Sequence, residues 1–269
     1  MILIDRQRYI GDLEKYGDKE YPEFLYKYRR ADNKNDLMFL TEPIVYLSSP
    51  IKFEDDEKDC RLPKQYPNRK EDIIQLLKQD LHKKYSEWDD QKLTSEAEKI
   101  DSPLLHPEKI IEFERERQDI DNKMLGILSL TLRFDNEYMW EKYGGNSTGF
   151  CIKYDTNLLF DCTKGAIHSI SYEEELPKIK QLEEYWMYSF LTNYFTKRTN
   201  PFCKEEEWRI YKRGFSAVDD ENRRVPIAKE CIKAVYLGTK MSDNYKQEIT
   251  ELVRNKYGLE AIDLSKGKL

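Results

Sequence analysis

Glycine is distributed unevenly along this 269-residue chain, and that distribution limits which elements each part can form. None of the 11 glycines lies between Asp18 and Leu125, whereas Gly126 and the glycines after it interrupt the rest of the chain at short intervals. Glycine permits tight turns and weakens helix interiors. We therefore expect long helices in the first part and short strands joined by turns in the second.

The glycine-free part contains two segments with helical periodicity. Apolar side chains recur every three to four residues from Ile73 to Trp88 and again from Ile110 to Met124, with charged residues of both signs between them. These segments predict a helical insert or subdomain over about 54–123, within a single domain that covers 1–269. Because the insert is so rich in charge, we expect solvated helices that cover the core or select a partner, with no catalytic role.

Short β-branched and aromatic segments at 24–29 and 43–49, and several more after Gly126, predict strands. A long helix is expected over about 177–198. Strands and helices do not alternate regularly, so the predicted fold class is α+β, with a mixed or antiparallel central sheet and flanking helices.

Composition excludes several classes of protein. The 45 Lys and Arg residues against 51 Asp and Glu residues give a net charge of −6, so bulk charge offers no attraction to nucleic acid or to an acidic membrane. No apolar run approaches the roughly 18 residues of a membrane span, and the first residues lack an export signal. The five cysteines are widely spaced. We expect a cytoplasmic protein with free cysteines, no membrane contact and no structural metal site.

Two segments contain candidate functional residues. The first, 139–152, includes Tyr143 and three glycines within six residues, which would let a ligand backbone or phosphate come close. The second, 197–210, includes Glu205 and Glu207. Because neither segment makes a complete site alone, we predict that they meet in space around a shared ligand pocket.

The charged residues of the second segment allow two interpretations. In an extended conformation Glu205, Glu207 and Arg209 share one face, while Trp208 and Ile210 face the core. The charged face is then either an ion-pair ladder on the surface or a polar site, and the spacing alone favours the ladder. The acidic run Glu54–Glu57 is likewise expected to be a solvated loop in preference to a cation site.

Several features in this order carry a family resemblance: FLYKYR, IVYLSSPIKF, ILSLT, MWEKYGGNSTGFCIKY, the later Lys197, EEEWRI and IKAVYLG. Over roughly 24–255 the chain resembles the bacterial domain-of-unknown-function family twenty-nine seventy-one. This family has no settled activity to transfer. The chain departs from the family pattern at Glu54–Glu57, where Asn-Asp-Pro is usual, and at Phe202, where Trp is usual.

The order of elements also resembles the ADP-ribosyltransferase fold, including its toxin and phage-defence members. This resemblance implies NAD as the cofactor, with Glu207 or Glu205 stabilising the positive charge that develops when the nicotinamide bond breaks. Tyrosine faces would stack on nicotinamide, and Arg or Lys would pair with the pyrophosphate. The cofactor-binding residues expected on this basis are Tyr26, Lys27, Tyr28, Arg29, Ser48, Tyr143 and Arg209.

Three functions therefore stay open. The leading one is an ADP-ribosyltransferase-like or NAD-cleaving enzyme that binds a nucleotide and acts on a nucleic-acid or protein acceptor. A metal-dependent nuclease would use Glu205, Glu207 and either Asp55 or Asp56 to hold divalent ions. A non-catalytic sensor would bind a nucleotide or a protein through the same aromatic and glycine-rich segments.

Overall fold

The computed structural model describes residues 22–31, 34–67, 69–180 and 186–267. Its main sheet has seven strands: β1 (Phe24–Arg29), β4 (Leu125–Thr131), β5 (Phe150–Asp155), β6 (Ala166–Ser169), β10 (Glu207–Arg213), β12 (Ile232–Leu237) and β13 (Ile262–Asp263). Their order across the sheet is β13-β12-β5-β1-β4-β10-β6. Neighbouring strands run antiparallel except for the parallel pair β12 and β13, which confirms a mixed sheet.

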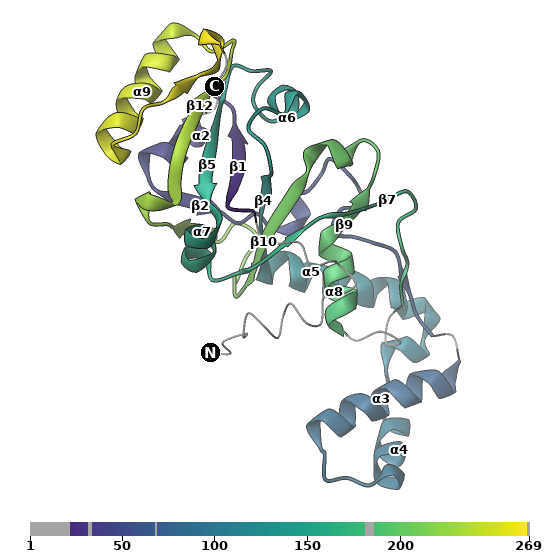
Figure 1. Ribbon diagram of the computed structural model, residues 1–269. Helices are drawn as coiled ribbons and strands as arrows, with labels where there is room; N and C mark the ends of the chain where they lie inside the picture. Colours follow the sequence, from purple (N-terminus) through teal and green to yellow (C-terminus); the bar gives the residue numbers. More distant parts are fainter. Residues whose placement is uncertain (1–21, 32–33, 68, 181–185, 268–269) are drawn as a thin grey trace.

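Helices and short strand pairs surround this sheet (Figure 1). The helices are α2 (Lys34–Thr41), α3 (Lys70–Lys84), α4 (Asp90–Glu98), α5 (Ile110–Met124), α6 (Glu137–Lys142), α7 (Thr156–Thr163), α8 (Trp186–Phe195) and α9 (Asp243–Tyr257). The strand pairs are β2 (Ile44–Tyr46) with β11 (Arg224–Pro226), β3 (Lys64–Gln65) with β8 (Ile179–Lys180), and β7 (Ser171–Glu173) with β9 (Thr196–Arg198). The α+β class is thus confirmed. Helices α3 and α4 lie at the end of the molecule opposite β12 (Figure 1).

The main sheet consists of two well-paired halves joined at one point. Strand β1 pairs along its whole length with β5, and β4 pairs along its whole length with β10. Between β1 and β4 the register contains a single pair, Tyr26 with Thr131. Beyond that pair the two strands diverge, and the opening between them is where a cavity forms.

The side chains of β1 serve both faces of the sheet. Leu25 is completely buried in the main core, and Lys27 and Arg29 follow it on the same face. On the opposite face Tyr26 and Tyr28 join a second cluster with Trp140 of α6, whose ring meets Tyr28 edge-on at 4.9 Å. This alternation places two cationic side chains of one strand next to the divergence of the sheet.

The long helix predicted over about 177–198 is wrong in extent. Helix α8 covers only Trp186–Phe195, while Ile179–Lys180 and Thr196–Arg198 are strands, and 181–185 lie outside the described residues. The strand β9 pairs in parallel with β7, Lys197 lying opposite Tyr172. Tertiary pairing therefore overrides the local helical periodicity, and it directs Lys197 into the site.

Candidate functional site

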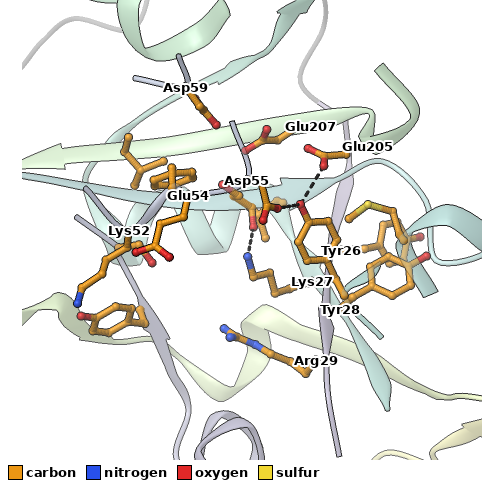
Figure 2. A pocket seen from close by; sticks show the side chains of 18 of the residues that line it. Tyr26, Lys27, Tyr28, Arg29, Lys52, Glu54, Asp55, Asp59, Glu205 and Glu207 are labelled. Carbon is orange, nitrogen blue, oxygen red and sulfur yellow. Dashed lines mark hydrogen bonds between the residues drawn. The ribbon is translucent and has the colours of Figure 1, made fainter. Parts of the chain in front are cut away.

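A cavity of about 490 Å³ occupies the divergence between the two halves of the sheet (Figure 2). Eight of the nine residues expected at the site line it: Tyr26, Lys27, Tyr28, Arg29, Ser48, Tyr143, Glu205 and Glu207. The prediction that the Tyr143 segment and the Glu207 segment share one pocket is therefore confirmed. Tyr28 is a part of the wall, because its hydroxyl donates to the carbonyl of Arg133 and its ring is packed on Trp140.

Glu205 and Glu207 are buried side by side, joined by the ammonium group of Lys197. Glu205 and Glu207 are 3% and 5% exposed, and Lys197 is 5% exposed. Lys197 Nζ lies 2.7 Å from Glu205 Oε2 and 3.1 Å from Glu207 Oε2. A surface ion-pair ladder, which the spacing favoured, is therefore wrong. The charged side chains instead form a polar site beneath the cavity.

The two carboxylates reach this position from different backbone conformations. Glu205 ends a 3-10 turn (Phe202–Glu205), Glu206 has a left-handed φ of 45°, and the strand β10 begins only at Glu207. The expected continuous strand from Glu205 is wrong for this reason. The turn at Glu206 nevertheless brings both carboxylates to the same ammonium group, whereas Trp208 and Ile210 enter the core as predicted.

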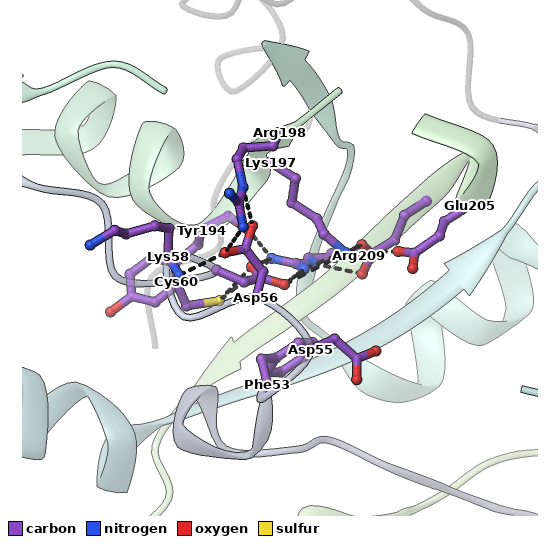
Figure 3. Close-up of polar contacts among 12 residues, drawn as sticks. Phe53, Asp55, Asp56, Lys58, Cys60, Tyr194, Lys197, Arg198, Glu205 and Arg209 are labelled. Atoms are coloured by element: carbon purple, nitrogen blue, oxygen red, sulfur yellow. Dashed lines mark hydrogen bonds and ion pairs between the residues drawn. The ribbon is translucent and has the colours of Figure 1, made fainter. Parts of the chain in front are cut away.

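Arg209 lies behind Glu207 and is completely buried. Its guanidinium donates to Glu207 Oε1 at 2.7 Å, to both oxygens of Asp59 at 2.9 and 2.7 Å, and to the carbonyl of Tyr194 at 2.7 Å (Figure 3). With a further hydrogen bond to Glu207 Oε2 at 3.2 Å, these contacts occupy all the N–H donors of the guanidinium, so the expected pairing of Arg209 with a pyrophosphate is wrong. Arg209 is a positioning residue for Glu207.

Electrostatics keep Glu207 ionised. Burial by itself would raise the pKa of Glu207, but the charges of Arg209 and Lys197 outweigh burial and hold that pKa well below its usual value. Burial would likewise lower the pKa of Lys197, yet the facing carboxylates, Glu207 first, raise it. The site therefore presents a fixed carboxylate to the cavity at neutral pH.

Residues of the acidic run after Lys52 form one wall of the cavity. The expected solvated loop is therefore wrong for part of this run. Asp56 is 3% exposed, and both of its oxygens accept from Arg198, at 2.9 and 3.1 Å (Figure 3). Asp55 Oδ2 lies 2.9 Å from the hydroxyl of Tyr143 and 3.0 Å from Lys142. The first residues of the predicted insert thus belong to the site, because these contacts hold them against it.

Tyr143 and Lys142 connect this wall to the buried carboxylates. The Tyr143 hydroxyl lies 2.8 Å from Glu205 Oε1, and Lys142 Nζ lies 2.9 Å from the same oxygen. Sequence reasoning missed Lys142, Lys197 and Asp59 as site residues. Lys197 lies at the start of the candidate segment 197–210, and that position is a signal that could have identified it. The role of Asp59 depends on a contact with Arg209 that no local sequence pattern reveals.

The other end of the cavity is cationic. Lys27, Arg29, Arg30 and Lys52 all line the cavity, and so do the carboxylates of Asp36 and Glu54, with Glu54 beside Lys52 (Figure 2). Lys27 Nζ donates to the carbonyl of Ser129 at 2.7 Å and so bridges the two halves of the sheet. Arg29 Nη1 lies 3.3 Å from Asp36, while its Nε is buried without a hydrogen-bond partner.

The glycine-rich loop was expected to let a ligand backbone or phosphate come close, but its glycines are in contact with the protein itself. A side chain at Gly149 would collide with the backbone oxygen of Arg29, and one at Gly144 would collide with the ring of Trp140. Asn146 and Ser147 both have positive φ, and the amide of Gly238 donates to the carbonyl of Gly149. The glycines permit close packing of the chain against itself, at the end of β1.

Comparison with known proteins supports part of the family resemblance. No curated protein and no solved structure matches the chain. Among the described residues no helix is long and apolar enough to cross a membrane. Residues 139–210 match the family model described as Protein of unknown function (DUF2971), a segment that runs from α6 to the middle of β10 and contains Tyr143, Lys197, Glu205, Glu207 and Arg209.

Proposed function

We propose that this chain is an ADP-ribosyltransferase-like enzyme that cleaves the bond between nicotinamide and ribose in NAD. The observation that carries the proposal is the buried, ionised Glu207 at one end of a cavity whose other end is cationic. Such an enzyme transfers ADP-ribose to a nucleic-acid or protein acceptor, or to water. A role as a cytoplasmic toxin or phage-defence effector is compatible with this activity.

The chemistry requires a fixed negative charge near the breaking bond. Departure of nicotinamide leaves positive charge on the ribose, and a preorganised carboxylate stabilises that charge without having to reorient. Arg209 holds Glu207 from behind at 2.7 Å, and Lys197 holds it from the side. Four carboxylates meet three cations at this end of the cavity, which therefore keeps a net negative charge: Asp55, Asp59, Glu205 and Glu207 against Lys142, Lys197 and Arg209.

The cationic end suits the rest of the nucleotide. A pyrophosphate carries negative charge that Arg29, Arg30 and Lys52 would attract, and a guanidinium can bind a phosphate through two hydrogen bonds. The unpartnered Nε of Arg29 offers one such donor. In this orientation the ribose next to nicotinamide lies toward Glu207, and the phosphates lie toward the end of β1.

A nuclease would need these carboxylates as metal ligands. In the part of the chain that the structure describes, no three or more His, Cys, Asp or Glu side chains are grouped so that they could hold a metal ion. Glu205 and Glu207 contact Lys197, and Asp56 contacts Arg198, so a divalent ion would have to compete with these cations. The geometry therefore favours the NAD-cleaving function.

The test is turnover of labelled NAD by the full chain, with and without protein or nucleic-acid acceptors and with and without EDTA. Glu207→Gln keeps the shape and removes the charge, and it is expected to lower turnover by about 10²-fold or more. The matched control is Glu206→Gln, which changes a neighbouring carboxylate that does not line the cavity. Thermal melting establishes that both variants are folded.

Three results would overturn the proposal. Full NAD turnover in folded Glu207→Gln would remove this residue from the reaction. Nucleic-acid cleavage that disappears with EDTA would indicate the nuclease. Binding of NAD without turnover under any of these conditions would indicate the sensor.

A further inference from the structure

Lys27 stands in the middle of β1 with its amine in the opening between the two halves of the sheet (Figure 2). Its Nζ donates to the carbonyl of Ser129 at 2.7 Å. Among the residues that the structure describes, no carboxylate oxygen lies within 4.0 Å of this amine, so Lys27 forms no ion pair with any of them. Lys197, by contrast, has three carboxylates within the same distance, those of Asp59, Glu205 and Glu207. Lys27 and Lys197 therefore have opposite electrostatic surroundings.

Lys27 is half-buried, and an ammonium group that is partly removed from water with no counter-ion in contact is destabilised as a charge. Removing an ion from water costs several kcal/mol, and a buried lysine therefore tends to lose its proton. Burial, with the charge of Arg29 added, lowers the pKa of Lys27 to about 7, and the more distant carboxylates of Glu207, Asp36 and Glu205 do not restore it. At neutral pH a large share of Lys27 is thus a neutral amine, which is the nucleophilic form.

The neighbourhood of this amine selects an anionic ligand. Arg29 follows Lys27 on the same face of β1, and its Nε is buried without a partner. Arg30 and Lys52 also line the cavity. A small molecule that carries a phosphate would therefore be held beside a neutral primary amine, inside a cavity of about 490 Å³.

We propose that Lys27 is a reactive lysine that forms a Schiff base with the carbonyl carbon of a phosphorylated aldehyde or ketone. The amine lone pair attacks the carbonyl carbon, and the resulting carbinolamine loses water to give the imine; hydrolysis reverses both steps. The site goes beyond NAD cleavage and does not need it. If the proposed function holds, the ring-opened form of released ADP-ribose is one such phosphorylated aldehyde.

The experiment uses pyridoxal 5′-phosphate as the probe. Full-length protein is incubated with one equivalent of the probe, the imine is reduced to a stable amine with borohydride, and the modified lysines are mapped by mass spectrometry. We expect Lys27 to react at least ten-fold faster than the other lysines, with a rate that rises through pH 7. Pyridoxal, which lacks the phosphate, should react at Lys27 about ten-fold more slowly, and inorganic pyrophosphate should slow the labelling.

Two variants complete the test. Lys27→Arg keeps the positive charge and should abolish the fast labelling. Lys153→Arg changes a lysine on the neighbouring strand β5 that does not line the cavity, and should leave the labelling unchanged. Labelling of Lys27 at the rate of exposed lysines, or equal labelling by pyridoxal and its phosphate, would overturn the proposal. If Lys27→Arg fails to fold, the proposal is tested by mapping the labelled lysines and by pyrophosphate competition on the unsubstituted chain. Because labelling needs no NAD turnover, failure here and failure of the proposed function are separate results.

Discussion

The guanidinium of Arg209 and the carboxylate of Asp59 form a bidentate pair, with N–O distances of 2.9 and 2.7 Å, across 150 positions of sequence. The pair attaches the acidic segment after Lys52 to β10. It also satisfies the side of Arg209 that faces away from Glu207. One contact thus closes the wall of the cavity and orients the carboxylate within it.

Asp59→Asn should destabilise the protein strongly, because it leaves the buried charge of Arg209 without half of its compensation. Removing one partner of a buried ion pair costs about 3–5 kcal/mol in the free energy of unfolding. Urea unfolding of the variant measures the loss. Asp101→Asn is the control, since Asp101 is exposed, and it should change the free energy of unfolding much less than Asp59→Asn does. Equal stability of the two variants would show that the pair contributes little.

Lys197→Met should raise the pKa of Glu207. An ammonium group in contact lowers a carboxyl pKa by about 1–3 units, and its removal loses that effect and leaves Glu205 and Glu207 as two neighbouring carboxylates. NMR titration of the carboxyl carbons measures the pKa directly, and the acid limb of NAD turnover should move to higher pH. Lys204→Met, an exposed lysine of the same turn, should leave both unchanged. An unaltered titration of Glu207 would mean that Lys197 does not set its charge.

Lys27→Met should change how stability depends on pH. Folding lowers the pKa of Lys27 from 10.5 to about 7, so between these values the unfolded chain binds a proton that the folded chain does not. Stability from this residue therefore rises with pH over that window, by up to about 1.4 kcal/mol per pH unit. Urea unfolding at several pH values from 7 to about 9 should show this rise in the unmodified chain and in Lys153→Met, but not in Lys27→Met. Parallel curves for all three proteins would contradict it.

Arg223→Lys should also be destabilising, although charge is kept. The Arg223 guanidinium donates to the carbonyls of Leu47, Ala217, Asn122, Lys123 and Leu125, at 2.6 to 3.1 Å. A lysine ammonium cannot reach all five, and each buried carbonyl left unsatisfied costs about 1–3 kcal/mol. Calorimetric melting should show a clear loss. Arg224→Lys, at the exposed neighbouring position, is the matched control. A melting temperature equal to that of the control would refute the argument.

Local patterns were sufficient where a residue's environment depends on its neighbours in sequence. The alternation of Trp208 and Ile210 predicted their burial, and the periodicity after Ile110 predicted α5 almost to its ends. They failed where two local tendencies compete. Glu206 has a left-handed conformation, so the strand begins after it and does not include Glu205. The end of the predicted helix is instead the strand β9, which pairs with β7.

Hydrophobic periodicity and the resemblances predict the α+β class, the strand-forming segments and the residues that line the cavity. Such patterns depend only on short stretches of chain. The charge state of the site does not. Whether Glu207 is a solvated surface group or a buried ion depends on Lys197, Arg209 and Asp59, which come from three separate segments. Burial and ion pairing depend on distances in space, and the divergence of β1 from β4 that creates the cavity exists only once both halves of the sheet have assembled.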